Sequence, residues 1–189
     1  MQIPSARLAT EVGGAVQLQA VDPATVFDLA GPVRASAMFV FVLLVGSVLL
    51  WRHKGFVEYS TTATLSDPLR TIGYGIATHA VLVFAALYLG SQLALVDVAG
   101  VNFGTVGLLL GGVLLGVTGS VGFTVVGIAI VDVWGEAAGW SGVALGALLA
   151  GGVAGLEPLV AGVVWVGLVS FGIGGAVRDW LRASARADI

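Results

Sequence analysis

The stretch VAGVNFGTVGLLLGGVLLGVTGSVGFTVVGIAIV, residues 98–131, contains no charged side chain. A helix over all 34 of these residues would be about 51 Å long at 1.5 Å per residue, whereas the hydrocarbon core of a bilayer is about 30 Å thick. The stretch therefore predicts a membrane-spanning helix that tilts, breaks, or begins with a loop. We expect a loop at 97–103 and place a candidate break near Thr118-Gly119-Ser120.

The rest of the chain has the composition of an integral membrane protein. Of its 189 residues, 58% are hydrophobic and 10% are charged, whereas soluble domains average about 45–50% apolar and about 25% charged residues. The mean hydropathy of +1.03 excludes an ordinary soluble domain. The absence of cysteine excludes disulfide scaffolds and thiolate metal sites. We expect no bound cofactor or metal, and the chain carries no basic patch for nucleic acid.

Charge-free gaps predict an all-α, glycine-rich bundle of about five transmembrane helices. A crossing needs about 20 mostly apolar residues. The predicted spans, inside a membrane domain at 32–181, are 33–51, 69–95, 104–131, 138–156 and 158–177. Two of these spans begin with Asp67-Pro68 or Glu157-Pro158, a pattern in which the acidic residue caps the helix and the proline occupies its first turn.

Three segments outside the spans are polar. Residues 1–31 are predicted to form an extracellular N-terminal segment, in which Asp22-Pro23 can start a short interfacial helix; the alternative is a disordered terminus. Residues 52–70 are predicted to be the longest polar loop, and 182–189 a frayed tail. We expect no cleavable signal peptide, because no basic cluster precedes an apolar run at the N-terminus.

Arginine and lysine predict the orientation, because cytoplasmic segments of membrane proteins are enriched in both. The connection at 52–70 and the C-terminal end each carry three of these residues. Both are expected to be cytoplasmic, with the N-terminus outside the plasma membrane. Four predicted crossings separate the two basic segments, so the span count agrees with this orientation.

Glycines are concentrated in the second half of the chain, at spacings of four residues. Small residues let helix backbones approach closely in membranes. We therefore expect Gly112, Gly116, Gly142 and Gly146 to face other helices. Two other interpretations remain open: a self-association face, or a broken helix near residues 118–120 whose free backbone groups bind an ion or substrate.

His79 is the one ionisable residue expected deep in the membrane. It shares a helical face with Gly75, Ala86 and Gly90, so a neighbouring helix should lie close to it. An intramembrane ionisable residue is a functional candidate, and Thr118 and Ser120 are the other candidate polar groups. In the structural interpretation, His79 is neutral and hydrogen-bonded to a Ser, a Thr or a carbonyl of the next helix. The alternatives are a proton or ligand role, and exposure to lipid.

Two further patterns predict no chemistry. Asp132 and Glu136 lie one turn apart at an expected cytoplasmic helix end, where a solvated pair is favoured over a cation site. The sequence Gly-Trp-Ser-Gly at 139–142 resembles the nucleophile motif of rhomboid intramembrane proteases. In that family the histidine base lies on a later span, and here no histidine follows His79. We therefore expect no catalytic residue.

Two short motifs carry a family resemblance. Asp-Pro-Leu-Arg at 67–70 opens one span, and Thr-Val-Val-Gly-Ile at 124–128 ends a later one. With these motifs the run 67–129 resembles uncharacterised haloarchaeal multi-span membrane proteins, some of whose relatives join such a domain to a polymer-forming, bactofilin-like module. Those relatives often have proline where this chain has Ala129. The acid-leaning, lysine-poor composition is also typical of a high-salt archaeon. The resemblance implies a membrane domain and no catalytic residues.

The sequence thus favours a structural, anchoring or assembly component of a membrane over an enzyme. Its expected partners are the lipid bilayer and a homo- or hetero-oligomer formed through small-residue helix faces. The alternative function is a small channel or transporter that uses His79 and the glycine-rich third span. The two differ in one feature: a transporter needs a water-accessible polar path, whereas a scaffold has a dry, glycine-packed interior.

Overall fold

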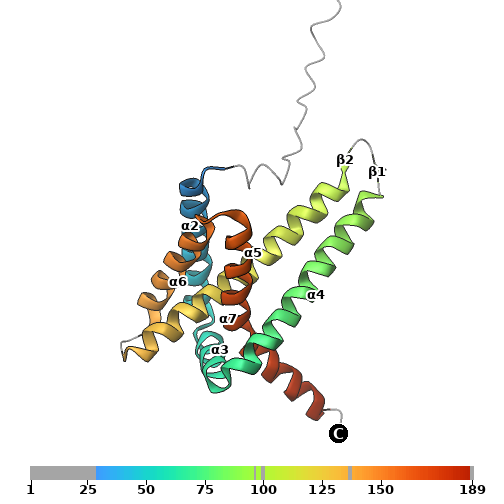
Figure 1. The fold of residues 1–189 in the computed structure, drawn as a ribbon. Coiled ribbons are helices and arrows are strands. Elements are labelled where there is room, and N and C mark those ends of the chain that lie inside the picture. Colours follow the sequence, from blue (N-terminus) through green and yellow to red (C-terminus); the bar gives the residue numbers. More distant parts are fainter. Residues whose placement is uncertain (1–28, 96, 99–100, 136–137, 188–189) are drawn as a thin grey trace, which may run out of the picture.

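The computed structural model describes residues 29–95, 97–98, 101–135 and 138–187. This part of the chain is an all-α bundle, as predicted (Figure 1). Its helices are α2 (Gly31–Arg52), α3 (Lys54–Ser66), α4 (Pro68–Ala94), α5 (Phe103–Val133), α6 (Ala138–Ala154) and α7 (Pro158–Ala187). The interfacial helix predicted near Asp22 lies outside the described residues.

Four of these helices, α2, α4, α5 and α7, are long and apolar enough to cross a membrane. They coincide with four of the five predicted spans. The fifth, α6, has 17 residues and is apolar but shorter than the others. Its length is at the lower limit of about 17–25 residues for a crossing.

The predicted helix starts are present at α4 and α7. The carboxylate of Asp67 accepts a hydrogen bond from the backbone N–H of Arg70, at 3.4 Å, and α4 begins at Pro68. The carboxylate of Glu157 accepts from the backbone N–H groups of Leu159 and Val160, at 3.0 and 3.2 Å. Each carboxylate satisfies backbone donors that have no partner within their own helix.

The predicted loop between α4 and α5 is present, but the predicted break in α5 is not. Strands β1 (Asp97–Val98) and β2 (Val101–Asn102) form a short antiparallel pair, after which α5 runs unbroken from Phe103 to Val133. The hydroxyls of Thr118 and Ser120 donate to carbonyls four residues earlier in the same helix, at 2.8 and 2.9 Å. The helix is about 46 Å long at 1.5 Å per residue, and it crosses α7 obliquely (Figure 1).

The polar connection at 52–70 is a helix rather than the predicted loop. Its residues form α3, which packs mainly against α7, and its buried side chains include Val57, Ser60 and Thr64. Four of its hydroxyl groups donate to carbonyls within the same helix, at Ser60, Thr61, Thr62 and Ser66. Serine and threonine are weak helix formers. Tertiary packing therefore accounts for this helix better than local propensity does.

The C-terminal segment also differs from the prediction. Helix α7 continues to Ala187, ten residues past the predicted end of the span at 177, so most of the expected frayed tail is helical. This extension runs past α3, at the end of the bundle where α2 ends and α4 begins (Figure 1). The basic connection and the basic C-terminal segment therefore lie at the same end of the bundle.

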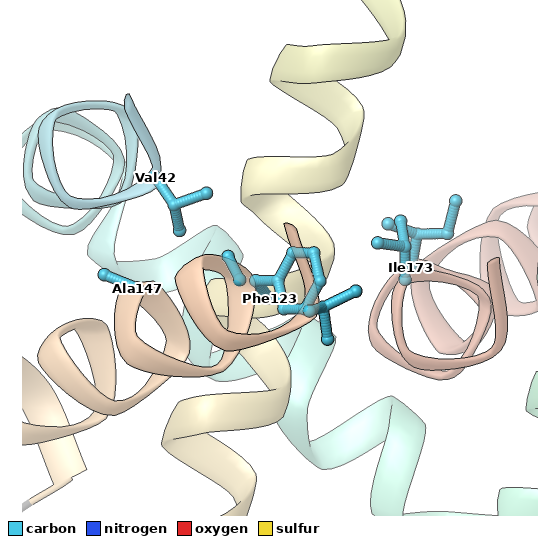
Figure 2. Close-up of a cluster of buried hydrophobic side chains, with 7 residues drawn as sticks. Val42, Phe123, Ala147 and Ile173 are labelled. Carbon is cyan, nitrogen blue, oxygen red and sulfur yellow. The ribbon is translucent and has the colours of Figure 1, made fainter. Parts of the chain in front are cut away.

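Phe123 of α5 is the centre of the apolar core (Figure 2). Its side chain is fully buried in a cluster that includes Val42 of α2, Ala147 of α6 and Ile173 of α7. Four tryptophans, by contrast, have exposed side chains. Trp51, Trp134 and Trp140 lie close to helix ends, and Trp180 lies close to the predicted end of the last span. This is the placement expected of an interfacial aromatic belt.

Of the four glycines predicted to face other helices, three lie against a neighbour. A Cβ atom at Gly142 would lie 2.6 Å from the Cα of Ile128, and one at Gly146 would meet the carbonyl of Phe123. A Cβ at Gly116 would lie 3.2 Å from the ring of Phe41. The prediction for Gly112 is wrong, because a Cβ there would meet no described atom within 4 Å. Gly111, the preceding residue on α5, faces Ala86 of α4 instead.

Candidate functional site: a buried histidine between α4 and α7

Helices α4 and α7 pack in backbone contact, and this contact positions the candidate site. Thr71, Gly75 and His79 follow one another at four-residue spacing on α4, and such residues share a helix face. On α7 the facing residues are Ser170 and Gly174. A Cβ at Gly75 would meet the backbone of Ser170, and a Cβ at Gly174 would meet the carbonyl of Thr71. Glycine is required at both positions because no side chain fits between the helices.

His79 lies in this interface and is 3% exposed. Its Nδ1 is 3.2 Å from the carbonyl oxygen of Gly75 and 3.2 Å from the hydroxyl of Ser170. Because a carbonyl can only accept, the Gly75 contact is a hydrogen bond when Nδ1 carries the proton. In the other tautomer, Nδ1 accepts from the Ser170 hydroxyl. A serine on the next helix is the kind of partner that the structural interpretation predicted.

The indole ring of Trp165 closes the site toward α5. The rings of His79 and Trp165 are 5.1 Å apart between centroids and nearly perpendicular, at 81°. The indole also lies against α5, where a Cβ at Gly119 would be 2.6 Å from its Cζ2 atom. Unlike the other four tryptophans, Trp165 is partly buried and packs against the apolar core. The histidine is therefore enclosed by a serine, a glycine backbone and an indole.

Thr118 and Ser120 do not join His79 in one site. Both hydroxyls donate to carbonyls of their own helix, as described above. Because α5 is continuous there, its carbonyls remain in the helical hydrogen-bond ladder and none is freed for an ion. The binding site suggested by the sequence near Gly119 is thus replaced by a packing contact with Trp165.

Arg178 is a buried charged residue of the C-terminal segment, which the sequence predicts to be cytoplasmic. Its side chain is 2% exposed. The guanidinium donates to the carbonyl of Ala63 at 3.0 Å, to the hydroxyl of Ser66 at 2.9 Å and to the carboxylate of Asp179 at 2.8 Å. It therefore binds the C-terminal end of α3, where the carbonyl of Ala63 also accepts from the hydroxyl of Ser66 at 2.8 Å. The sequence contains no signal for this contact, because it predicts a loop where α3 forms.

His79 does not line either of two cavities in the described part of the protein. One of about 760 Å³ opens between α2, α3, α5 and α6, and Asp132 is among its lining residues. The other, of about 460 Å³, lies at the surface beside Arg70 and Arg182. Glu136, the predicted neighbour of Asp132, lies outside the described residues. Among the residues that are described, no three histidine or acidic side chains are grouped to hold a metal.

Comparison with known proteins adds no relative to this picture: no family model, curated protein or solved structure matches the chain.

Proposed function

We propose that the protein is a structural, anchoring or assembly component of an archaeal plasma membrane, without enzymatic activity. The observation that carries this proposal is the enclosure of His79. The imidazole is held by Gly75 and Ser170, is covered by Trp165 and lines neither cavity. A side chain that moves protons or ions needs a path for water, and a packed helix interface needs none.

The pairing of Ser170 with His79 supports a packing role over catalysis. A serine next to a histidine is the arrangement that activates a nucleophile. Here the hydroxyl of Ser170 is fully buried, and α4 and α7 are in backbone contact beside it. A substrate carbonyl would have to separate the helices to reach the serine oxygen.

The distribution of basic residues supports an orientation for this component. The guanidinium of Arg34, at the end where α2 begins, donates to the carbonyl of Leu156 at 2.9 Å. The opposite end, around α3, holds most of the other basic residues: Arg52, Lys54, Arg70, Arg178 and Arg182. By the positive-inside rule, the α3 end faces the cytoplasm and the N-terminus lies outside.

Cysteine labelling tests this orientation directly, because the natural chain contains no cysteine. We expect Ser5→Cys to react with a membrane-impermeant maleimide on intact cells, and Ser184→Cys to react only after the cells are opened. Labelling of Ser184→Cys from outside would show that the orientation is reversed.

Several glycines leave helix surfaces open for assembly with a second copy or another membrane protein. A Cβ at Gly152, Gly162 or Gly167 would meet no described atom within 4 Å. Small residues on a lipid-facing helix permit close association with another helix. In this proposal, Gly162→Leu together with Gly167→Leu lowers the oligomer fraction in native mass spectrometry while the monomer remains folded. An unchanged distribution would remove α7 from the assembly interface.

One observation favours the alternative, a small channel or transporter. The Nε2 atom of His79 is buried and has no hydrogen-bond partner among the described residues. An unpaired buried nitrogen is costly, and a transported ion or proton would give it a partner. The continuous α5 and the enclosure of the imidazole by Gly75, Ser170 and Trp165 favour the structural role instead.

Flux measurements distinguish the two functions. The full chain and its His79→Gln variant are reconstituted in liposomes that contain a pH-sensitive dye, and a pH gradient is applied. We expect the wild-type protein to carry no more flux than empty liposomes. A wild-type flux that is lost in a folded His79→Gln variant would replace the structural proposal with the transporter, since glutamine does not titrate.

A further inference from the structure

The cavity of about 760 Å³ lies at the α3 end of the bundle, where α2 and α5 end and α3 and α6 begin (Figure 1). Small-molecule sites have volumes of about 300–1,000 Å³, so the cavity is large enough for an organic ligand. It is separate from the enclosed site at His79. Its walls combine apolar, aromatic and charged side chains, and each group limits the ligand that fits.

The apolar part of the wall belongs to the packed bundle. Leu50 of α2, Val57 of α3 and Ile128 of α5 line the cavity, and all three side chains are buried. Two tryptophans, Trp51 and Trp140, also line it and are 77% and 62% exposed. Buried aliphatic groups next to exposed indoles suit a ligand that has apolar substituents and remains partly in contact with water. The π face of an indole also attracts cations.

The charged part of the wall has a surplus of negative charge. The ammonium of Lys54 lies 3.4 Å from the carboxylate of Glu58, so these two lining charges compensate each other. Asp132, the third charged lining residue, forms no ion pair with the residues that the structure describes. It occupies the last turn of α5, where the helix dipole is negative and disfavours a carboxylate. A cation in the cavity would be attracted by both the carboxylate and the helix end.

We propose that this cavity binds a monovalent organic cation with apolar substituents, such as a quaternary ammonium or phosphonium ion. The positive charge is recognised by Asp132 and by the indoles of Trp51 and Trp140, and the substituents contact the aliphatic wall. A phosphate-bearing lipid headgroup is a poorer match, because Asp132 repels it and Lys54 is already paired. This binding activity goes beyond the structural role and does not depend on it.

Calorimetric titration with tetraphenylphosphonium tests the proposal on the full chain in phosphatidylcholine nanodiscs. Protein-free nanodiscs give the background from partition into lipid. We expect saturable binding, weakened about tenfold by Asp132→Asn, because a charge pair near a protein surface is lost. The matched control is Glu157→Gln, which removes the same charge at the opposite end of the bundle and should leave the affinity unchanged.

A second pair of variants tests the aromatic contribution independently. Trp140→Leu should weaken binding of tetraphenylphosphonium about fivefold, because a cation–π contact is lost while the site stays apolar. Trp180→Leu is the control, since this exposed tryptophan lies on α7 and does not line the cavity. Both replaced side chains are exposed, so the variants should retain the circular dichroism of the wild-type protein.

Tetraphenylborate has the same shape as the probe and the opposite charge, and it should show no saturable binding above the background of protein-free nanodiscs. The proposal is overturned if neither Asp132→Asn nor Trp140→Leu changes the affinity for the cation. It is equally overturned if tetraphenylborate binds in the cavity and Lys54→Gln abolishes this binding, since the site would then select anions such as lipid phosphates.

Discussion

The two halves of α5 have the same kind of sequence and opposite surroundings. Up to Val117 the described buried residues of the helix are three glycines, and leucines such as Leu110 are exposed. From Gly119 to Val131 nearly every residue is buried, with Phe123 at the centre of the core (Figure 2). Both halves are apolar and glycine-rich, because lipid and protein interior are equally apolar. Hydropathy therefore detects the span but does not show which half is packed.

The largest effect should come from a glycine in the packed half compared with one in the open half. A Cβ at Gly127 would lie 2.5 Å from the backbone nitrogen of Gly146 on α6, whereas one at Gly112 would meet nothing. Overpacking typically costs about 1–3 kcal/mol, and here the backbones must also separate. We expect Gly127→Leu to lower the free energy of unfolding by at least about 3 kcal/mol.

Gly112→Leu is the matched control on the same helix, and it should change the free energy of unfolding by less than about 0.5 kcal/mol. Unfolding both variants with dodecyl sulfate in mixed micelles measures the difference. Equal losses at the two positions would mean that the open half is covered in solution, for example by a second copy of the chain.

A smaller effect is expected at the α4–α7 interface, where the packed region contains polar groups. His79→Leu should cost about 1–3 kcal/mol, because the partners of the imidazole are left without a hydrogen bond inside the bundle. His79→Gln keeps a donor and an acceptor and should retain most of the stability. Thermal unfolding in detergent compares the two variants with the wild-type protein, and a glutamine variant as unstable as the leucine variant would count against the hydrogen-bonded role.

The smallest changes in the free energy of unfolding should come from replacing two threonines of α5, one buried and one exposed. The hydroxyl of Thr124 is buried and has no partner among the described residues, whereas that of Thr118 donates within its own helix. Thr124→Val removes an unsatisfied polar group, so it should raise the free energy of unfolding by up to about 1 kcal/mol. Thr118→Val should change it by less than about 0.5 kcal/mol. Denaturant titration of both variants checks the sign, and a loss at Thr124 would reveal a partner for its hydroxyl.

Charge-free gaps were sufficient to place the long apolar helices, because a charge inside a bilayer is costly whatever the fold. The helix starts at Asp67 and Glu157 were also predictable, because capping involves neighbouring residues only. Helix α3 was not predictable, because its serines and threonines favour a loop and the helix depends on contacts with α7.

The candidate site was predictable in part. The four-residue spacing of Gly75 and His79 indicated a close neighbour, and that inference needs only helical geometry. It did not show that the neighbour is α7, that Ser170 is the hydrogen-bond partner or that Trp165 covers the ring. Small-residue spacing likewise could not tell Gly112 from Gly142, because the same spacing occurs on lipid-facing and protein-facing surfaces.

The structural role of His79 requires that water does not reach the imidazole, and water-edited solid-state NMR measures this. The chain has only two histidines, so ¹⁵N-histidine labelling gives side-chain signals from two imidazole rings only, and His53→Gln assigns them. His53 lies exposed between α2 and α3 and supplies the internal reference. We predict fast magnetisation transfer from water to His53 and little to His79. Transfer to His79 as fast as to His53 would show a water-filled path to the imidazole and would rule out the structural role.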